Sequence, residues 1–367
     1  MKQRLAAVLI ALACALNLMA ADPGVGGPTT KSILYGGTAT LWPDFQDGTG
    51  VIDHGVGPVT SGTPYAVTPL VTTTYKLTIT NPAGDTVTGD VDVTVATVSV
   101  TAVSPATKTL STGKTFTFTS SVSGAVDSTV DWSVDGVPGG NSTVGVITAL
   151  GAYAAPGAPG LHSITATSHA NNSVSQSAAV TVVALPSIEG ALTATPNAIA
   201  YGGNTALSAT FSNGTGVLTG GATNQSVNSP VSFSTPTLVA STSYTLTVTN
   251  AANDTVTSTT SVTVSDVTMT ILSPATKNLS LTKTLQPTGG VVSGATHSGV
   301  IWSVNGVDSG NSTLGTISET GLYTAPDTMP GSARITIRVR SVDNPAIYQE
   351  LEVTLYKLPT IQSFTVN

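Results

Sequence analysis

Tyr75-Lys76-Leu77-Thr78-Ile79-Thr80-Asn81 alternates apolar with polar residues, and this stretch returns as Tyr244-Thr245-Leu246-Thr247-Val248-Thr249-Asn250. Strict alternation is the pattern of a half-buried β-strand, in which successive side chains point to opposite faces. Each copy ends at an asparagine that opens a short polar segment, residues 81–85 and 250–254. Asn, Gly and Asp tolerate the positive φ of a tight turn, so each copy predicts an antiparallel hairpin.

The repetition extends far beyond this hairpin. Residues 35–95 return as 201–264, and residues 104–156 return as 273–326. Matching over whole domains predicts a tandem array of two domain types in the order A-B-A′-B′. Helical periodicity is absent after the first residues, so we expect an all-β chain of four antiparallel β-sandwiches. The expected ranges are a signal peptide at 1–21, A at 22–98, B at 99–185, A′ at 186–267, B′ at 268–358, and the start of a further A-type repeat at 359–367.

Composition favours the same fold class and excludes one class of partner. Charged residues make up only 8% of the chain and aromatic residues 5%, a balance typical of sandwiches with Thr- and Ser-rich faces. After residue 21 there are 19 acidic residues and 10 basic ones, a formal charge of −9. Arg334, Arg338 and Arg340 follow a strand-like alternation that indicates a solvated sheet face. We therefore expect no nucleic-acid binding.

The first 21 residues have the pattern of an export signal. Lys2 and Arg4 precede an apolar stretch at residues 5–16, and small residues follow at 19–21, so we expect an extracellular or cell-surface protein. Cys14 is the only cysteine and lies inside this segment. Cleavage would leave a chain without disulfides, whereas lipidation at Cys14 is the alternative. No later segment approaches the about 20 apolar residues of a membrane span.

Two repeated aromatic positions predict buried cores. Trp132 and Trp302 each stand in a Val-x-Trp-Ser-Val strand that precedes an Asp-Gly or Asn-Gly turn. Their apolar neighbours favour a core role over stacking on a carbohydrate. Tyr153 and Tyr323 each lie between a glycine and a proline, which favours packing over ligand binding.

The expected joints between domains are short. They lie near residues 96–103, 184–188 and 265–272, and Pro186 stiffens the second, which predicts a semi-rigid rod. Leu358-Pro359-Thr360-Ile361 repeats Leu185-Pro186-Ser187-Ile188, the entry into A′. Either the chain is a fragment of a longer reading frame, or this strand pairs with a neighbouring molecule.

These motifs resemble the bacterial immunoglobulin-like (Big-type) repeat domains of surface and secreted proteins. In the B domains the resemblance rests on the Ser-Pro-Ala-Thr openings at 104 and 273, the Trp-Ser-Val segments and the Gly-x-Tyr-x-Ala-Pro segments. In the A domains it rests on Tyr-x-Leu-Thr, preceded by Thr in A and by Ser in A′, followed by Asn and Asp-Thr-Val-Thr. The resemblance implies immunoglobulin-like sandwiches with a spacer or adhesive role and no catalytic residues.

No catalytic, cofactor-binding or metal-binding residue is assigned from the sequence. The four histidines are not repeated between domains, which favours surface positions: His54, His162, His169 and His297. No Gly-x-Ser-x-Gly elbow occurs, so we expect no enzyme activity. Calcium is an alternative at the acidic residues Asp44, Asp47, Asp53, Asp90 and Asp92. A Lys–Asn crosslink is another, from Lys108, Lys114 or their repeats Lys277 and Lys283 to Asn141 or Asn311.

These observations predict a non-enzymatic, exported stalk or adhesive segment of a bacterial surface or secreted protein. Its partners would be a surface polysaccharide or a protein of a host or neighbouring cell. A first alternative is a set of glycan-binding modules attached to a secreted polysaccharide-degrading enzyme. It requires Trp42, Tyr65 and Tyr35 to be exposed and coplanar. A second alternative is a filament in which the C-terminal strand mediates self-association.

Overall fold

The computed structural model describes residues 29–365. The predicted signal peptide and Cys14 lie outside the described residues. Residues 29–365 form β-strands and no helix. None of these residues forms a helix long and apolar enough to span a membrane. The chain divides into two compact units, the first ending at Val183 and the second beginning at Ala184.

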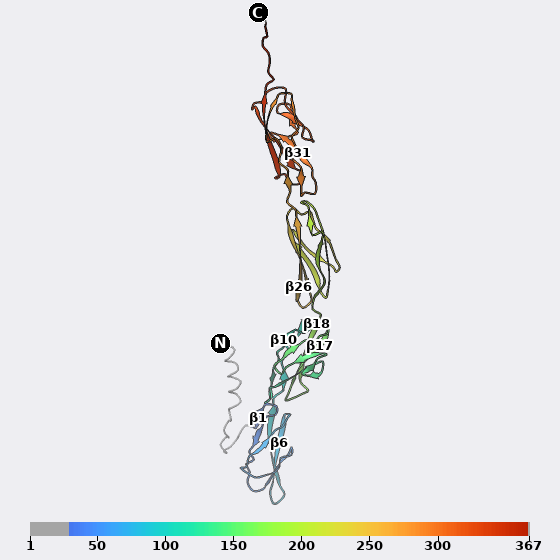
Figure 1. Ribbon diagram of the computed structural model, residues 1–367. Helices are drawn as coiled ribbons and strands as arrows, with labels where there is room; N and C mark the ends of the chain where they lie inside the picture. Colours follow the sequence, from blue (N-terminus) through green and yellow to red (C-terminus); the bar gives the residue numbers. More distant parts are fainter. Residues whose placement is uncertain (1–28, 366–367) are drawn as a thin grey trace. The chain divides into compact units, whose positions relative to one another are not determined.

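Domain A forms one five-stranded sheet in the order β1-β7-β6-β3-β4 and a small second sheet of β2 and β5 (Figure 1). Its strands are β1 (Thr30–Ile33), β2 (Ala39–Leu41), β3 (Thr49–Ile52), β4 (Gly57–Val59), β5 (Tyr65–Val67), β6 (Thr73–Thr80) and β7 (Thr86–Val95).

Domain B has a five-stranded sheet, β13-β12-β17-β18-β9, that faces a four-stranded sheet, β10-β16-β15-β14, with a short β8–β11 pair beside them. Its strands are β8 (Ser99–Val100), β9 (Thr107–Ser111), β10 (Thr115–Thr117), β11 (Val122–Ser123), β12 (Val130–Val134), β13 (Val137–Pro138), β14 (Gly140–Asn141), β15 (Gly145–Ile147), β16 (Ala152–Ala154), β17 (Gly160–Ser168) and β18 (Ser175–Val183).

Domain A′ repeats the larger sheet of domain A as β20-β26-β25-β22-β23, but its second sheet has three strands, β19-β21-β24. Its strands are β19 (Ser187–Thr195), β20 (Ala198–Ile199), β21 (Ala206–Ser212), β22 (Thr215–Gly220), β23 (Thr223–Val227), β24 (Val231–Ser234), β25 (Thr242–Thr249) and β26 (Thr255–Val264).

Domain B′ repeats the sheets of domain B as β28-β37-β36-β31-β32 and β29-β35-β34-β33, with the β27–β30 pair beside them. Its strands are β27 (Thr268–Met269), β28 (Thr276–Ser280), β29 (Thr284–Leu285), β30 (Val292–Ser293), β31 (Val300–Val304), β32 (Val307–Asp308), β33 (Gly310–Asn311), β34 (Gly315–Ile317), β35 (Tyr323–Thr324), β36 (Arg334–Ser341) and β37 (Tyr348–Tyr356).

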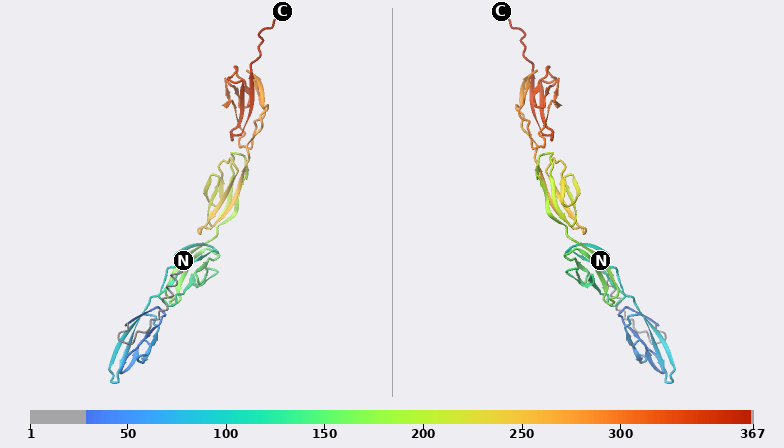
Figure 2. Two further views of the ribbon diagram at one scale, coloured as in Figure 1. Left: turned by 90° about the vertical axis from the view of Figure 1, so that its left-hand side faces the viewer. Right: turned by 90° about the vertical axis from the view of Figure 1, so that its right-hand side faces the viewer.

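All four domains share one topological feature. The first strand of the larger sheet runs parallel to the last strand of the domain, in the pairs β1–β7, β9–β18, β20–β26 and β28–β37. Each domain also has its own hydrophobic core, and Figure 2 shows the two layers of sheet within the domains. The chain is a tandem array of immunoglobulin-like β-sandwiches, as the sequence predicts. The exact boundaries of the domains stay predictions.

The predicted hairpins and cores are confirmed. The Asn81 side-chain oxygen accepts hydrogen bonds from the Ala83 and Asp85 amides at 2.9 Å each, and Asn250 does the same in domain A′. Trp132 and Trp302 are buried in the cores of the two B domains. Tyr153 is fully buried, and its hydroxyl donates a hydrogen bond to the Val144 carbonyl at 2.8 Å. Tyr323 repeats this contact with Leu314 at 2.7 Å.

The Tyr153 hydroxyl makes domain B sensitive to alkaline pH. Burial, together with the nearby Asp135 charge, raises the pKa of Tyr153 from 10.0 to about 12. The neutral phenol therefore stabilises the fold fully below pH 10, and this contribution is lost as the pH rises through the folded-state value. We expect Tyr153→Phe to cost about 1 kcal/mol at pH 7, since the buried Val144 carbonyl loses its donor. The variant should then lose less stability than wild type above pH 10.

Urea unfolding followed by ¹⁹F-tryptophan NMR checks this domain by domain, because Trp42, Trp132 and Trp302 lie in domains A, B and B′. Tyr356→Phe, at a half-exposed position on β37, is the matched control and should have little effect. An unchanged alkaline response of the Trp132 signal in Tyr153→Phe would show that this phenol does not set it.

Candidate functional site: the joint between A and B domains

The A and B domains of the first unit are joined by a backbone bridge outside the linker. The Tyr35 amide donates to the Gly124 carbonyl at 2.9 Å, and the Val126 amide donates back to the Tyr35 carbonyl at 3.0 Å. This places Tyr35 beside Ala125 as a parallel β-bridge. The Tyr35 ring packs against the core of domain B. A residue of domain A thus acts as a one-residue strand on domain B.

The second unit repeats the bridge with its own residues. Tyr201 donates to the Gly294 carbonyl at 2.8 Å and accepts from the Thr296 amide at 2.9 Å. The Thr296 hydroxyl adds a third hydrogen bond to the Tyr201 carbonyl at 2.7 Å. Here the tyrosine ring packs against the core of its own domain, A′. The backbone contacts are therefore the shared feature of the two joints, whereas the ring contacts differ.

A glycine is required at the accepting position of each bridge. Gly124 has a φ of 82° and Gly294 a φ of 80°, a conformation that favours glycine. A Cβ on Gly124 would also overlap the Thr97 carbonyl oxygen, and one on Gly294 would overlap that of Asp266. The linker thus passes directly against the bridge, and a side chain here would push the two apart.

The covalent linker in the first unit is short. β7 ends at Val95 and β8 begins at Ser99. Val98 and Val100 are buried in the core of domain B, so the chain joins the second core almost at once. Ser99 and Ser123 share a hydroxyl hydrogen bond at 2.8 Å beside the bridge. Two attachments, the linker and the bridge, restrict rotation of one domain against the other more than a single linker would.

The sequence predicts for Tyr35 only the stacking role of the glycan-binding alternative, and it predicts no role at a joint for Tyr35-Gly36-Gly37 or its repeat Tyr201-Gly202-Gly203. The bridging atoms are backbone amides and carbonyls, and these carry no signature in side-chain chemistry. The sequence carries one indication of the joint. The Tyr-Gly-Gly motif of each A domain recurs together with a Ser-Gly-Ala segment of the following B domain, Ser123-Gly124-Ala125 and Ser293-Gly294-Ala295.

Gly124→Ala should loosen the first joint without unfolding either domain. The chain after residue 21 has no cysteine, so spin labels at Thr88→Cys and Thr181→Cys report the distance between domains A and B. We expect double electron–electron resonance spectroscopy to show a broader distribution of the distance between the two labels in Gly124→Ala than in the parent.

Gly136→Ala is the control, because Gly136 has a similar φ of 79° and open space around it. It should leave the distribution unchanged. Equal distributions in the parent and Gly124→Ala would mean that the bridge does not restrict the joint.

The four histidines all lie beside aspartates. The Nδ1 atoms of His54, His162, His169 and His297 lie 2.9, 2.7, 2.8 and 3.0 Å from carboxylate oxygens of Asp53, Asp135, Asp131 and Asp343. The hydrogen bond with Asp131 raises the pKa of His169. The Nε2 atom of His162 is buried and has no hydrogen-bond partner among the described residues. The pairs of His162, His169 and His297 join residues 27, 38 and 46 positions apart, so they connect separate segments of the B-type domains.

Three of the five aspartates considered for calcium form hydrogen bonds within domain A. Asp53 accepts the Lys76 amide at 2.8 Å, and this bond together with His54 holds the pKa of Asp53 below its ordinary value. Asp44 accepts from Ser61, and Asp92 accepts from Thr74. Asp47 has a positive φ of 59°. Across residues 29–365, no three acidic, histidine or cysteine side chains gather closely enough to hold a metal ion.

Three of the residues considered for a Lys–Asn crosslink have other contacts. The Asn141 side chain accepts the Thr143 and Val144 amides, and Asn311 repeats this turn. The Lys108 ammonium lies 4.5 Å from the centre of the Phe116 ring.

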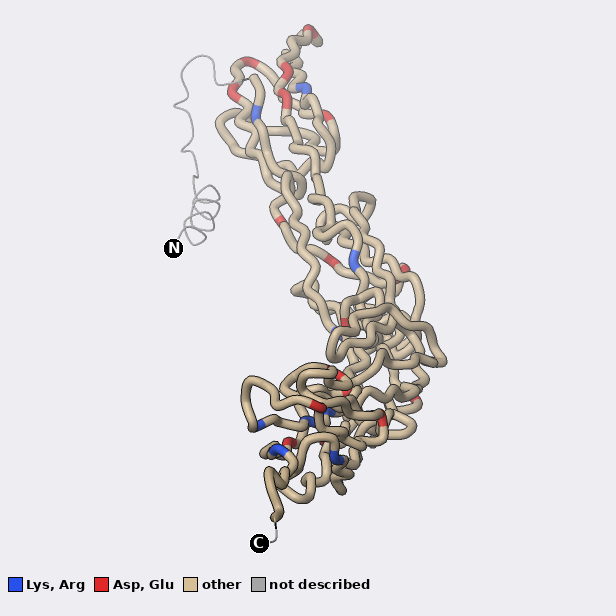
Figure 3. Tube along the Cα trace, turned by 90° about the horizontal axis from the view of Figure 1, so that it is seen from above, with Lys and Arg blue, Asp and Glu red and all other residues tan. Residues whose placement is uncertain are grey.

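The three arginines of domain B′ form ion pairs across a sheet face. Arg334 meets Glu352 at 3.0 Å, Arg338 meets Glu350 at 2.6 Å, and Arg340 binds Asp308 through two hydrogen bonds of 2.9 Å. In domain B, Thr165 and Ser177 occupy the positions that correspond to Arg338 and Glu350. Figure 3 shows that basic residues gather in domain B′ near the C-terminal end. The three arginines are thus paired with acidic residues on an exposed sheet face, which agrees with the predicted solvated face.

The aromatic residues proposed for glycan stacking do not form a common platform. Trp42 is 57% exposed. Tyr65 packs against the core of domain A, and its hydroxyl accepts the Thr60 amide at 2.7 Å. Tyr35 packs into domain B at the joint. Of the three rings proposed for stacking, only that of Trp42 is therefore largely exposed.

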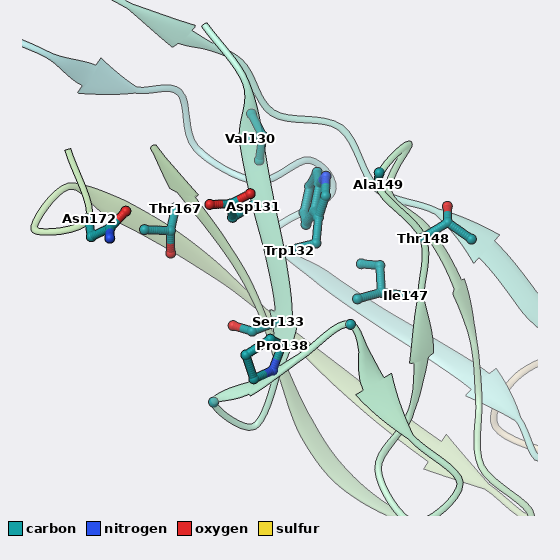
Figure 4. Close-up of a pocket in the computed structure, with 12 residues that line it drawn as sticks. Val130, Asp131, Trp132, Ser133, Pro138, Ile147, Thr148, Ala149, Thr167 and Asn172 are labelled. Carbon is teal, nitrogen blue, oxygen red and sulfur yellow. The ribbon is translucent and has the colours of Figure 1, made fainter. Parts of the chain in front are cut away.

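A hollow of about 510 Å³ lies beside β12 in domain B. Figure 4 shows Asp131, Thr167 and Asn172 on one side of this strand and Trp132 and Ala149 on the other. Asp131 is already paired with His169. The polar groups lie along the strand and do not converge on one point, so the hollow lacks the arrangement of a catalytic site.

Asp135→Asn should remove an acid sensitivity from domain B. Partial burial alone would raise the pKa of Asp135, but hydrogen bonds with His162 and the Ser163 amide lower it overall. A lowered carboxyl pKa stabilises the fold above the unfolded value of about 3.9, and this is lost as the pH falls through the folded value. Asn305 holds the same turn in domain B′, with a φ of 47° and a hydrogen bond from Thr336.

The measurement compares urea midpoints at pH 7 and pH 3 from the ¹⁹F signal of Trp132. The midpoint should fall less in Asp135→Asn than in wild type, whereas the Trp302 signal of domain B′ should fall equally in both proteins. An equal fall of the Trp132 signal would assign the acid sensitivity to other groups.

Comparison with known proteins found no matching family model and no matching curated protein. Among solved structures, the chain is similar to Sidekick-1 immunoglobulin domains 1–5, with 12% identity, a TM-score of 0.31, and coverage of 89% of this chain and 78% of that one. Invasin, a bacterial integrin-binding protein, gives 13% identity, a TM-score of 0.35, and coverage of 87% and 79%. The I-band fragment I67–I69 of titin gives 15% identity, a TM-score of 0.31, and coverage of 69% of this chain and 96% of that one. The low TM-scores give these similarities no weight in assigning a function.

Proposed function

We propose that the protein is a non-enzymatic, exported spacer and adhesive segment of a bacterial cell-surface or secreted protein. The observation that carries the proposal is the repeated backbone bridge between A and B domains, at Tyr35 in the first unit and Tyr201 in the second. A bridge kept in both units favours a chain whose task is to hold domains at a set spacing.

The arrangement of the cores supports a mechanical role. Each domain has its own core, so each is able to unfold as a separate unit, with Tyr35 of domain A as a contact to the core of domain B. The parallel pairing of first and last strands places several ladder hydrogen bonds across the direction of pull, for example the five pairs from Thr107↔Ala179 to Ser111↔Val183. A force on the ends loads these bonds together.

The proposed partners are a surface polysaccharide or a protein of a host or neighbouring cell, and the proposed location is outside the cell. The export pattern at residues 1–21 and the acidic, lysine-poor composition support this placement. The glycan-module alternative loses support, because two of its three aromatic residues pack inward.

Stretching of the chain in single-molecule force spectroscopy tests the spacer role. We expect four separate unfolding events, each releasing about 25–30 nm, since a domain of about 85 residues extends by about 3.6 Å per residue less its folded length. Gly124→Ala should retain all four events, because it alters the joint and leaves the cores intact. Traces with fewer than four events at measurable force would contradict the proposal.

A further inference from the structure

Domain A′ contains a strand that domain A lacks among the described residues. β19 pairs antiparallel with β21 and lies beside β26. Its Leu192 side chain is 3% exposed and belongs to the core of the domain. The Leu192 amide also donates to the Ser258 hydroxyl on β26 at 3.0 Å. β19 thus closes one side of this sandwich.

In domain A the matching edge has no such partner within residues 29–365. β2, which corresponds to β21, pairs with β5 alone. Pro43, two residues beyond β2, matches Ala209, the residue that β19 bulges past without pairing in domain A′. A proline at this point therefore leaves the edge able to accept a strand, because no donor is needed there.

The core face beneath that edge is open in domain A. Val248 is fully buried in domain A′, whereas its counterpart Ile79 is only partly buried. Val87 is 70% exposed, and its counterpart Val256 packs against the core. Gly89 replaces Ser258, and a Cβ on Gly89 would meet no atom within 4 Å. Among residues 29–365, no side chain of domain A fills the space that Leu192 fills in domain A′.

The entry into β19 recurs after domain B′. Leu358-Pro359-Thr360-Ile361 repeats Leu185-Pro186-Ser187-Ile188, and Phe364-Thr365 then follows one residue earlier than Leu192-Thr193 does in β19. Ile361 is 85% exposed and Phe364 is 97% exposed. Figure 2 shows these residues leading away from domain B′. Neither side chain packs into a core among residues 29–365.

The C-terminal segment differs from β19 in two ways that fit the open edge of domain A. The new segment has one residue fewer than β19 between its isoleucine and its second apolar residue, and β19 has register shifts in this part. A segment without the bulge residue can pair more regularly. Phenylalanine is larger than leucine, and Gly89 provides the extra room where Ser258 stands in domain A′.

The residues before Thr29 offer a poorer match. Residues 22–28 contain three glycines and two prolines, with Val25 as their one large apolar residue. Glycine and proline are depleted in strands, and position 26, which corresponds to Leu192, is a glycine. This sequence does not supply the apolar side chain that the open face of domain A requires.

We propose that the open edge of domain A, formed by β2, Ile79, Val87 and Gly89, accepts residues 358–365 of a second copy of this chain as an added strand. The donor and the acceptor belong to different compact units, so pairing with a second copy needs no particular arrangement of the units within one chain. Repeated addition links copies head to tail. This interaction goes beyond the proposed spacer role and does not rest on it.

Sedimentation velocity of the chain from residue 22 to 367 tests the proposal over a range of concentrations. We expect masses of two or more copies that increase with concentration. Deletion of residues 360–367 and the variant Phe364→Asp should each give a monomer. Val87→Asp on the acceptor should do the same, whereas Thr88→Asp, on the opposite face of β7, should still associate.

A peptide of residues 358–367 provides the second readout. The labelled peptide should bind the chain that lacks residues 360–367, and the same peptide with Phe364→Asp should bind at least tenfold more weakly. Peptide binding to the truncated chain with Val87→Asp should be lost. The ¹⁹F signal of Trp42 in domain A shows whether each variant remains folded.

Two results would overturn the proposal. A full-length chain that stays monomeric at every concentration while the peptide fails to bind would show that the edge does not accept this strand. A chain that associates only after residues 22–28 are removed would show that those residues occupy the edge instead.

Discussion

The parallel pairing of the first strand of the larger sheet with the last strand of the domain is the constraint on which the rest of each domain depends. Because these two strands run in the same direction, the chain enters the first at one end of the sandwich and leaves the last at the other. No disulfide is present in residues 29–365 to close the domain, so this ladder and the apolar core close it. The buried Tyr153 and Tyr323 rings fill the space between the two layers in the B domains.

The joints rely on backbone atoms for their shared contacts. A bridge made from amides and carbonyls tolerates changes of side chain at most of its positions, which explains why Tyr35 and Tyr201 keep the same hydrogen bonds although their rings pack against different cores. Glycine is the exception, since the linker approaches Gly124 and Gly294 too closely for a Cβ. The joint therefore requires a particular residue type, glycine, at one position in each unit.

Much of the fold was predictable because it is carried by side-chain pattern. Alternation at Tyr75, Leu77 and Ile79 indicated a strand, and the valines around Trp132 indicated a core. The joint was not predictable in this way, because Gly124 lies 89 residues after Tyr35 and bonds to it through its carbonyl. The pairing of each histidine with an aspartate also left no repeated signal, since His162 and His169 have no counterpart in domain B′.

The alternation of A and B types has a consequence for how the chain is made. Neighbouring domains of similar sequence can exchange strands during folding and become trapped as misassembled pairs. In this chain, the domain that follows A is of the other type, and the next A-type sequence emerges only after B is complete. The Arg–Glu pairs of domain B′ and the Thr–Ser pair of domain B further distinguish the two B-type sheets. A strand of one B-type domain that entered the other would leave these charges without partners, which disfavours the exchange.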